Sequence, residues 1–202
     1  SLRGRLKQLL FEDPYDNTNV VAERVGDRYV ALTETPRWVA FDPDTLATRG
    51  HVQYDGPEPA GQLSCAHLRR DPRTGTLVNV ETAFGRTSRY HVHEVVGPGE
   101  RDHLASVPVD EPAYMHSFAM TANYVVLTEF PFVVDPMRFL LPGDRGPFVE
   151  QFEWKPERGT RFVVIDRERG EVVAEPRADP VFGFHHVNAY EVGERDGPPD
   201  SR

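Results

Sequence analysis

Short runs in which β-branched and aromatic residues alternate with polar ones recur along most of the chain. This period of two is typical of half-buried strands, because successive side chains of a strand point to opposite faces of a sheet. Only residues 2–11, with leucines at positions 2, 6, 9 and 10, have the spacing of a short helix. The pattern predicts an all-β fold, with strands at residues 28–34, 38–41, 77–82, 89–96, 117–121, 124–129, 161–166, 171–175 and 184–191.

Turns that begin with aspartate separate several of these runs, at residues 42–45 (DPDT), 71–75 (DPRTG) and 166–170 (DRERG). Aspartate can accept hydrogen bonds from its own turn, proline presets φ, and glycine takes left-handed conformations readily. The turns therefore predict hairpins, and hairpins in series are typical of propellers and sandwiches. Their spacing is irregular, so the pattern by itself leaves both architectures open.

Composition and charge narrow the chemistry. The 202 residues are 39% hydrophobic and carry a formal charge of −9, which argues against nucleic acid as a partner because phosphate binding depends on clustered Lys and Arg. The single cysteine, Cys65, excludes an intrachain disulfide and a cysteine-based zinc site, so histidine and carboxylate would have to hold a metal. The chain shows neither a run of roughly 20 apolar residues nor a signal peptide, which favours a cytoplasmic location.

Histidines are the candidate metal ligands, and they stand at positions 51, 67, 91, 93, 103, 116, 185 and 186. His116 lies in an uncharged stretch that leads into an apolar strand, where a buried imidazole needs a partner for each ring nitrogen. His67 follows small residues and precedes a hairpin turn, so we expect it at the inner end of a β blade. His185 and His186 are neighbours on an expected strand, so only one of them can face a common site.

His91 and His93 form a second candidate pair. Two positions apart on a strand, they share a face and could chelate a metal. The surrounding residues 89–94 (RYHVHE) are polar on both sides, which favours a solvated strand face over a site. A hydrolase or another metal enzyme that uses this pair stays an alternative.

Several motifs resemble those of the carotenoid cleavage oxygenase family, in the family's order and at comparable separations. They are residues 31–36 (ALTETP), 66–67 (AH) before the DPRTG turn, 114–121 (YMHSFAMT) with 125–131 (VVLTEFP), and 184–191 (FHHVNAYE). Residues 16–20 (DNTNV) resemble the strand that precedes the first of these motifs in the family. We therefore interpret residues 1–202 as part of one carotenoid oxygenase domain, matched from about 16 to 191 and followed by a polar tail at 193–202.

The resemblance implies a seven-bladed β-propeller that holds Fe(II) on its axis with four histidines from different blades. It assigns three of these ligands to His67, His116 and His185, and the family's His-x-x-Asn spacing selects His185 over His186. Glu34 matches a glutamate that hydrogen-bonds a ligand histidine. The fourth histidine and further glutamates are expected beyond residue 202, and further blades before residue 1. We therefore expect the chain by itself to bind iron weakly.

The activity implied by the resemblance is that of a dioxygenase that cleaves a C=C bond of a carotenoid, an apocarotenoid or a stilbene-like substrate. Such an elongated apolar substrate needs an apolar tunnel, for which Phe118, Phe130 and Phe132 are candidates, although aromatic residues also serve in cores. A peripheral membrane contact fits a substrate of this kind, and the oligomeric state is left open. The alternative is a non-catalytic propeller segment that binds an apolar ligand or a protein, supported by the missing fourth histidine.

Overall fold

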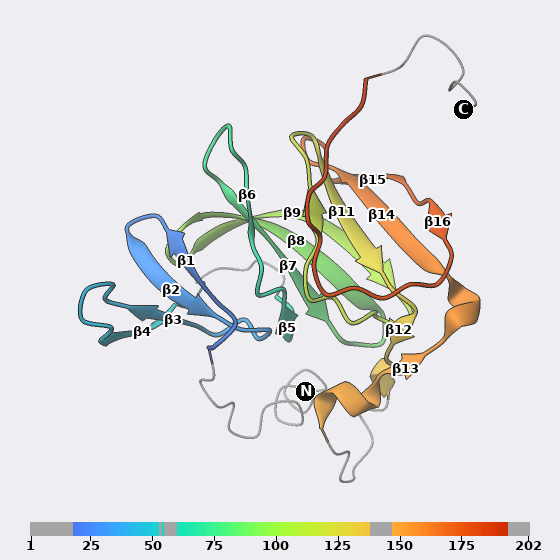
Figure 1. Cartoon of the computed structure of the whole chain (residues 1–202), viewed down its shortest axis with the longest axis horizontal. Helices are drawn as coiled ribbons and strands as arrows, with labels where there is room; N and C mark the ends of the chain where they lie inside the picture. Colours follow the sequence, from blue (N-terminus) through green and yellow to red (C-terminus); the bar gives the residue numbers. More distant parts are fainter. Residues whose placement is uncertain (1–17, 53, 55–59, 138–146, 194–202) are drawn as a thin grey trace.

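The computed structural model describes residues 18–52, 54, 60–137 and 147–193, and these are almost entirely β-structure and loops (Figure 1). The expected all-β fold is confirmed. The expected helix at residues 2–11 and nearly all of the polar tail lie outside the described residues. Within the described part, no helix is long and apolar enough to cross a membrane.

Antiparallel sheets follow one another along the chain. The first sheet has the order β1-β2-β3-β4, with β1 Val21–Val25, β2 Arg28–Leu32, β3 Trp38–Phe41 and β4 Thr48–Val52. The second has the order β5-β7-β8-β9 with β6 also on β7, from β5 Leu63–Ser64, β6 Arg69–Arg70, β7 Leu77–Ala83, β8 Ser88–Gly97 and β9 Glu100–Val109. The third has the order β10-β11-β14-β15 with β16 also on β14, from β10 Ala119–Met120, β11 Tyr124–Glu129, β14 Thr160–Asp166, β15 Glu171–Ala174 and β16 Arg177–Ala178. A ribbon of β12 (Phe132–Val133) and β13 (Glu153–Trp154) and two 3-10 turns, η2 (Phe148–Gln151) and η3 (Pro156–Arg158), complete the described elements.

Each aspartate-led turn closes a pair of strands, as expected. Asp42 accepts a hydrogen bond from the Thr45 N–H at 2.8 Å between β3 and β4. Asp71 accepts one from the Arg73 N–H at 2.8 Å between β6 and β7, and Asp166 accepts one from the Glu168 N–H at 2.9 Å between β14 and β15. The hairpins are therefore fixed by local chemistry that is visible in the sequence.

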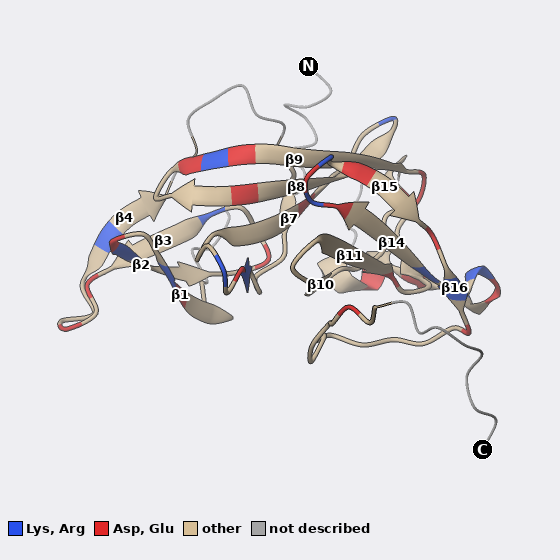
Figure 2. Cartoon of the chain, turned by 90° about the horizontal axis from the view of Figure 1, so that it is seen from above, with Lys and Arg blue, Asp and Glu red and all other residues tan. Residues whose placement is uncertain are grey.

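The second sheet lies between the other two and packs on both (Figures 1 and 2). Val78 and Val80 of β7 join a core with Leu127 and Ile165 of the third sheet. Leu77, on the opposite face of β7, joins a core with the first sheet. Both faces of β7 and β8 are therefore buried.

Two differences from the sequence expectations follow from position in a sheet. The expected strand at residues 184–191 is wrong, because this segment has no sheet partner among the described residues. The longer strands that the pattern did not indicate are β1, β4 and β9, and all three lie at the edges of their sheets, where charged residues and, in β9, Pro108 are tolerated. The described residues form separate sheets rather than a closed ring, so the seven-bladed propeller stays a prediction.

Candidate metal centre

Side chains of three histidines from separate elements converge on one point. His67 lies between β5 and β6, where the edge strand of the second sheet is interrupted. His116 precedes β10, the edge strand of the third sheet, and His185 lies in the extended segment that follows β16. One ring nitrogen from each lies within 4.8 Å of the others, and the ring centroids are 4.8 to 4.9 Å apart. Among the described residues, no other group of His, Cys, Asp and Glu ligand atoms converges in this way.

Small buried residues bring the first two of these segments together. Cys65 and Ala66 are almost completely buried, and the Cys65 N–H donates to the Val80 carbonyl at 2.8 Å. The Cys65 thiol contacts the Met115 carbonyl at 3.2 Å, next to His116. Burial raises the pKa of this thiol, so it stays protonated and acts as a weak donor. The cysteine is therefore part of the packing beneath the site.

Glu34, in the loop after β2, orients His116. Its Oε1 atom lies 2.6 Å from the His116 Nδ1 atom and accepts a hydrogen bond from the Tyr114 hydroxyl at 2.6 Å. A carboxylate beside Nδ1 selects the tautomer with the proton on that nitrogen, so the Nε2 lone pair faces the site. Burial, followed by the bond to Glu34, raises the pKa of Tyr114, which keeps the hydroxyl a donor.

The donor geometry fits a metal ion. The Nε2 atoms of His67 and His116 are 3.1 Å apart, and two nitrogens bound to one metal at about 2.1 Å lie roughly 3 to 3.4 Å apart for ordinary coordination angles. Partial burial and then the neighbouring His116 and His185 lower the pKa of His67, which favours the neutral form that binds metals. Imidazole nitrogen suits iron, zinc, copper and nickel, so the residues fit Fe(II) without selecting it over the other three.

His186 points away from this centre. Its Nδ1 atom lies 3.0 Å from the Ser117 hydroxyl and its Nε2 atom lies 2.8 Å from the Thr128 hydroxyl. Its ring stacks on Phe130. The neighbouring histidines thus face opposite directions, as the sequence indicated, although the segment that carries them is not a strand.

The expected solvated face for His91 and His93 is wrong. His91 is 6% exposed and His93 is fully buried, because β8 is an interior strand of the sheet that packs on both sides. The His91 Nδ1 atom and the His103 Nε2 atom both lie within hydrogen-bond distance of the Ser106 hydroxyl, at 2.7 and 2.8 Å. The sequence could not show this burial, since a polar pattern does not report what packs over a strand face.

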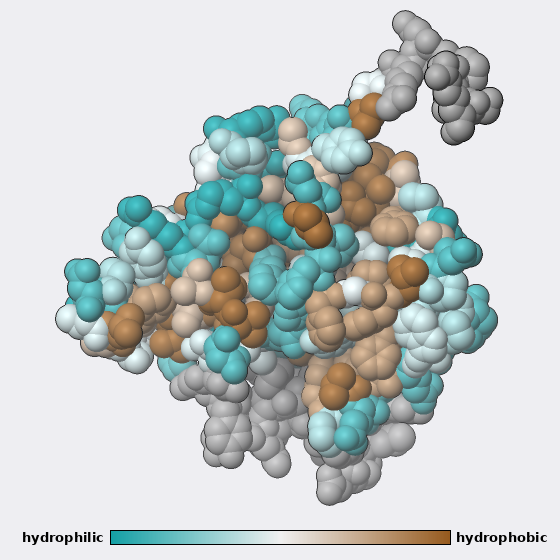
Figure 3. Space-filling view, in the orientation of Figure 1, coloured by the Kyte–Doolittle hydropathy of each residue, from teal (hydrophilic) through white to brown (hydrophobic). Residues whose placement is uncertain are grey.

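Aromatic rings surround one side of the three histidines. Phe118 is fully buried in the core between the second and third sheets, whereas the rings of Phe130 and Phe132 lie 5.5 and 5.7 Å from the ring of Phe182. The Phe184 ring lies 5.5 Å from His116 and 5.1 Å from Phe182. Phe182 was missed, and its place three residues before His185 was the available signal. In Figure 3, apolar side chains gather on this face beside the β12–β13 ribbon.

Known proteins share this sequence and architecture. Residues 9–198 match the family described as retinal pigment epithelial membrane protein (RPE65). A carotenoid dioxygenase of Neurospora crassa is 34% identical over 170 residues, which are 79% of this chain and 27% of the relative. The chain spans about a third or less of the length of the curated relatives it matches.

Solved structures show the same arrangement of strands. Cobalt-substituted Synechocystis apocarotenoid oxygenase superposes with a TM-score of 0.69 at 24% identity, over 88% of this chain and 38% of that chain. The lignostilbene dioxygenase of Pseudomonas brassicacearum superposes with a TM-score of 0.63 at 28% identity, over 78% of this chain and 32% of that chain. With the family match over residues 9–198, these findings show that the chain belongs to the RPE65 family of carotenoid oxygenases.

Proposed function

We propose that this chain is part of an iron(II)-dependent dioxygenase that cleaves a C=C bond of a carotenoid, apocarotenoid or stilbene-like substrate. The observation that carries the proposal is the convergence of His67, His116 and His185 within 4.8 Å of one another, with Glu34 on His116. Two relatives are named for action on carotenoids and lignostilbene, and a third accepts cobalt, which supports a divalent metal here.

Bound Fe(II) would supply the redox chemistry that activates dioxygen toward an alkene. His67, His116 and His185 would hold it, and as neutral imidazoles they would leave its charge uncompensated. Glu34 supplies a carboxylate one imidazole away, which both orients His116 and offsets part of that charge. The chain's contribution is thus to place three lone pairs at one point and to keep His116 in one tautomer.

The aromatic side chains suit an apolar, conjugated substrate. Phe182 and Phe184 are 41% and 51% exposed and lie beside the histidines. Phe130 and Phe132 contact Phe182 and extend the apolar surface away from His116. Rings of this kind stack on a polyene or stilbene and exclude water from the double bond. In this proposal Phe130 and Phe132 line the substrate side, and Phe118 belongs to the core.

Anaerobic equilibrium dialysis of the chain against Fe(II), with iron quantification on both sides of the membrane, tests the metal centre. Each of His67→Ala, His116→Ala and His185→Ala is expected to lower the retained iron at least about tenfold. His103→Ala is the control, because this histidine contacts Ser106 away from the site. Iron that survives all three substitutions would contradict the proposal. Iron-loaded protein is then assayed for loss of the absorbance of an apocarotenoid and of a stilbene.

One observation favours a non-catalytic segment that binds an apolar ligand or a protein. Val181, Phe184 and Tyr190 are 51%, 51% and 80% exposed along the extended segment. This alternative predicts that the chain binds the apocarotenoid equally well in the presence of Fe(II) and of a chelator. Stoichiometric iron together with cleavage would exclude it.

A further inference from the structure

Arg69 contacts the backbone next to two of the candidate ligand histidines and lies two residues after the third. Its Nε atom donates to the Phe118 carbonyl at 2.8 Å, and its Nη2 atom donates to the His186 carbonyl at 2.6 Å. Phe118 follows His116 by two residues, and His186 follows His185 by one. One guanidinium therefore joins the three segments that carry His67, His116 and His185, although they are far apart in the sequence.

The His185 segment depends on side-chain bonds of this kind. Residues 181–192 have no strand partner in the described part of the chain, so no sheet ladder holds them. The Ser117 hydroxyl donates to the Phe184 carbonyl at 2.8 Å and accepts from the His186 N–H at 3.2 Å. Ser117 itself adjoins His116. The bonds from Arg69 and Ser117 thus flank His185 on both sides.

The charge of Arg69 does not account for its position. A cation close to a divalent metal opposes metal binding by like-charge repulsion, yet the side chain is turned toward this region and donates to two carbonyls. A guanidinium presents its donors in a rigid plane, so it can hold two carbonyls at a fixed separation, whereas an ammonium is a point charge on a flexible stem. The fixed geometry of its donors, and not its charge, therefore explains the position of Arg69.

We propose that Arg69, together with Ser117, is a positioning residue that holds His67, His116 and His185 at metal-binding distance before a metal arrives. The inference rests on the proposed metal centre. It assigns to Arg69 no contact with metal or substrate. Loss of the guanidinium lets the His185 segment move away from the other two histidines. Part of the metal-binding free energy is then used to reassemble the site, so metal affinity falls.

Titration of the full chain with Co(II), read by its visible absorption, tests this role. Arg69→Met is expected to weaken Co(II) binding about 10- to 100-fold and to alter the cobalt spectrum. Arg69→Lys keeps the charge but replaces the rigid planar pair of donors with an ammonium on a flexible stem, so an intermediate loss is expected. Arg70→Met is the matched control, because the neighbouring side chain binds Glu23 and the carbonyls of Arg24 and Gly75 instead. Its affinity should equal that of the wild type.

Hydrogen exchange of the metal-free chain gives a second readout, independent of metal. Arg69→Met should speed exchange at residues 184–191, including the His186 N–H, and Arg70→Met should not. Unchanged or tighter Co(II) binding by Arg69→Met, or unchanged exchange, would overturn the role of Arg69. If the wild type binds no Co(II), the proposed function fails and exchange alone decides the positioning role. If Arg69→Met does not fold by circular dichroism, Arg69→Lys and Ser117→Ala provide the same comparison.

Discussion

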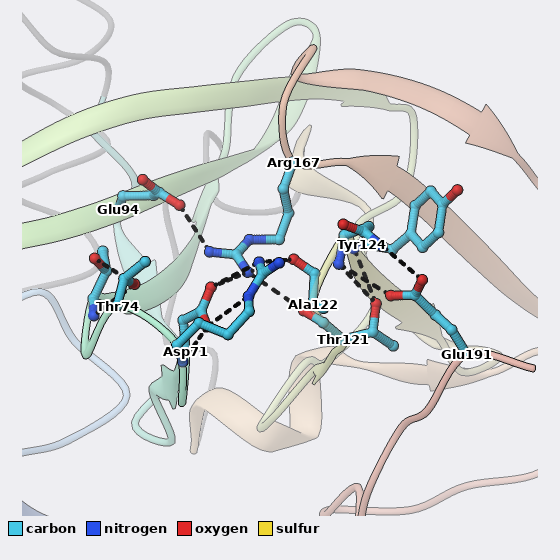
Figure 4. A network of polar contacts seen from close by, with 11 residues as sticks. Asp71, Thr74, Glu94, Thr121, Ala122, Tyr124, Arg167 and Glu191 are labelled. Carbon is cyan, nitrogen blue, oxygen red and sulfur yellow. Dashed lines mark hydrogen bonds and ion pairs between the residues drawn. The ribbon is translucent and has the colours of Figure 1, made fainter.

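A buried ion pair between Asp71 and Arg167 should contribute strongly to stability, because it joins the second and third sheets (Figure 4). Asp71, in the turn between β6 and β7, is 1% exposed and accepts a hydrogen bond from Arg167 Nη1 at 2.7 Å. Arg167, in the turn between β14 and β15, is 9% exposed and also bonds Glu94 at 3.0 Å and the Ala122 carbonyl at 3.0 Å. We therefore expect Asp71→Ala to destabilise the fold.

The structure sets the expected cost. Removing one partner of a buried pair costs about 3 to 5 kcal/mol, because it leaves the other charge buried without compensation. Arg167 keeps Glu94 and the Ala122 carbonyl, so we expect about 3 kcal/mol, at the lower end. Asp42→Ala is the matched control, since Asp42 begins the same type of turn and pairs with Arg49, which is 63% exposed. Because solvent screens an exposed pair, Asp42→Ala should cost less than Asp71→Ala.

Urea unfolding at neutral pH, monitored by circular dichroism, measures the loss of unfolding free energy in Asp71→Ala and in Asp42→Ala. A double-mutant cycle of Asp71→Ala with Arg167→Met should give a coupling energy of about 2 kcal/mol. Hydrogen bonds from Arg73 and then the contact with Arg167 hold the pKa of Asp71 well below its usual range. Its stabilising effect is therefore complete above about pH 5 and is lost as the pH falls further, so the unfolding free energies of the wild type and of Asp71→Ala should converge in acid. A cost no larger than that of Asp42→Ala, or a coupling below about 0.5 kcal/mol, would show that this ion pair does not hold the two sheets together.

Other expected outcomes concern the site and the core. Glu34→Ala should weaken Co(II) binding about 10- to 100-fold. Glu34→Gln should weaken it less, because the glutamine oxygen can still accept hydrogen bonds from His116 and Tyr114. Glu111→Gln is the control, because Glu111 pairs with Lys155 instead. Burial and then the charge of Arg101 lower the pKa of His93 to about 3. Unfolding therefore takes up a proton between about pH 6.5 and 3, and the unfolding free energy falls as the pH falls through that window. His93→Leu should flatten this pH dependence in urea unfolding, and an unchanged pH dependence would contradict the prediction. Phe118→Ala should lower the unfolding free energy by about 3 to 5 kcal/mol. Phe184→Ala, at a 51% exposed position, should lower it by less than about 1 kcal/mol. Equal losses would contradict the placement of Phe118 in the core and of Phe184 at the surface.

The local parts of this fold could be predicted from the sequence. The aspartate-led turns and strands such as β3 (Trp38–Phe41) and β11 (Tyr124–Glu129) lie where alternation and turn chemistry indicated them, because both signals act over a few residues. The same approach placed a strand at residues 184–191 and missed the edge strands β1, β4 and β9. Those two outcomes depend on whether a partner strand lies alongside, which alternation does not report.

The candidate ligands His67, His116 and His185, and Glu34 beside them, came from motifs along the sequence and from their resemblance to a family. Packing between distant segments brings these side chains within 4.8 Å of one another, places Glu34 on His116 and lets Arg69 join the three segments. It also decided that His93 is buried and that Phe118 belongs to the core. The physical reason is the same in each case: residue type and spacing specify which face of a strand a side chain occupies, but packing between sheets determines what covers that face.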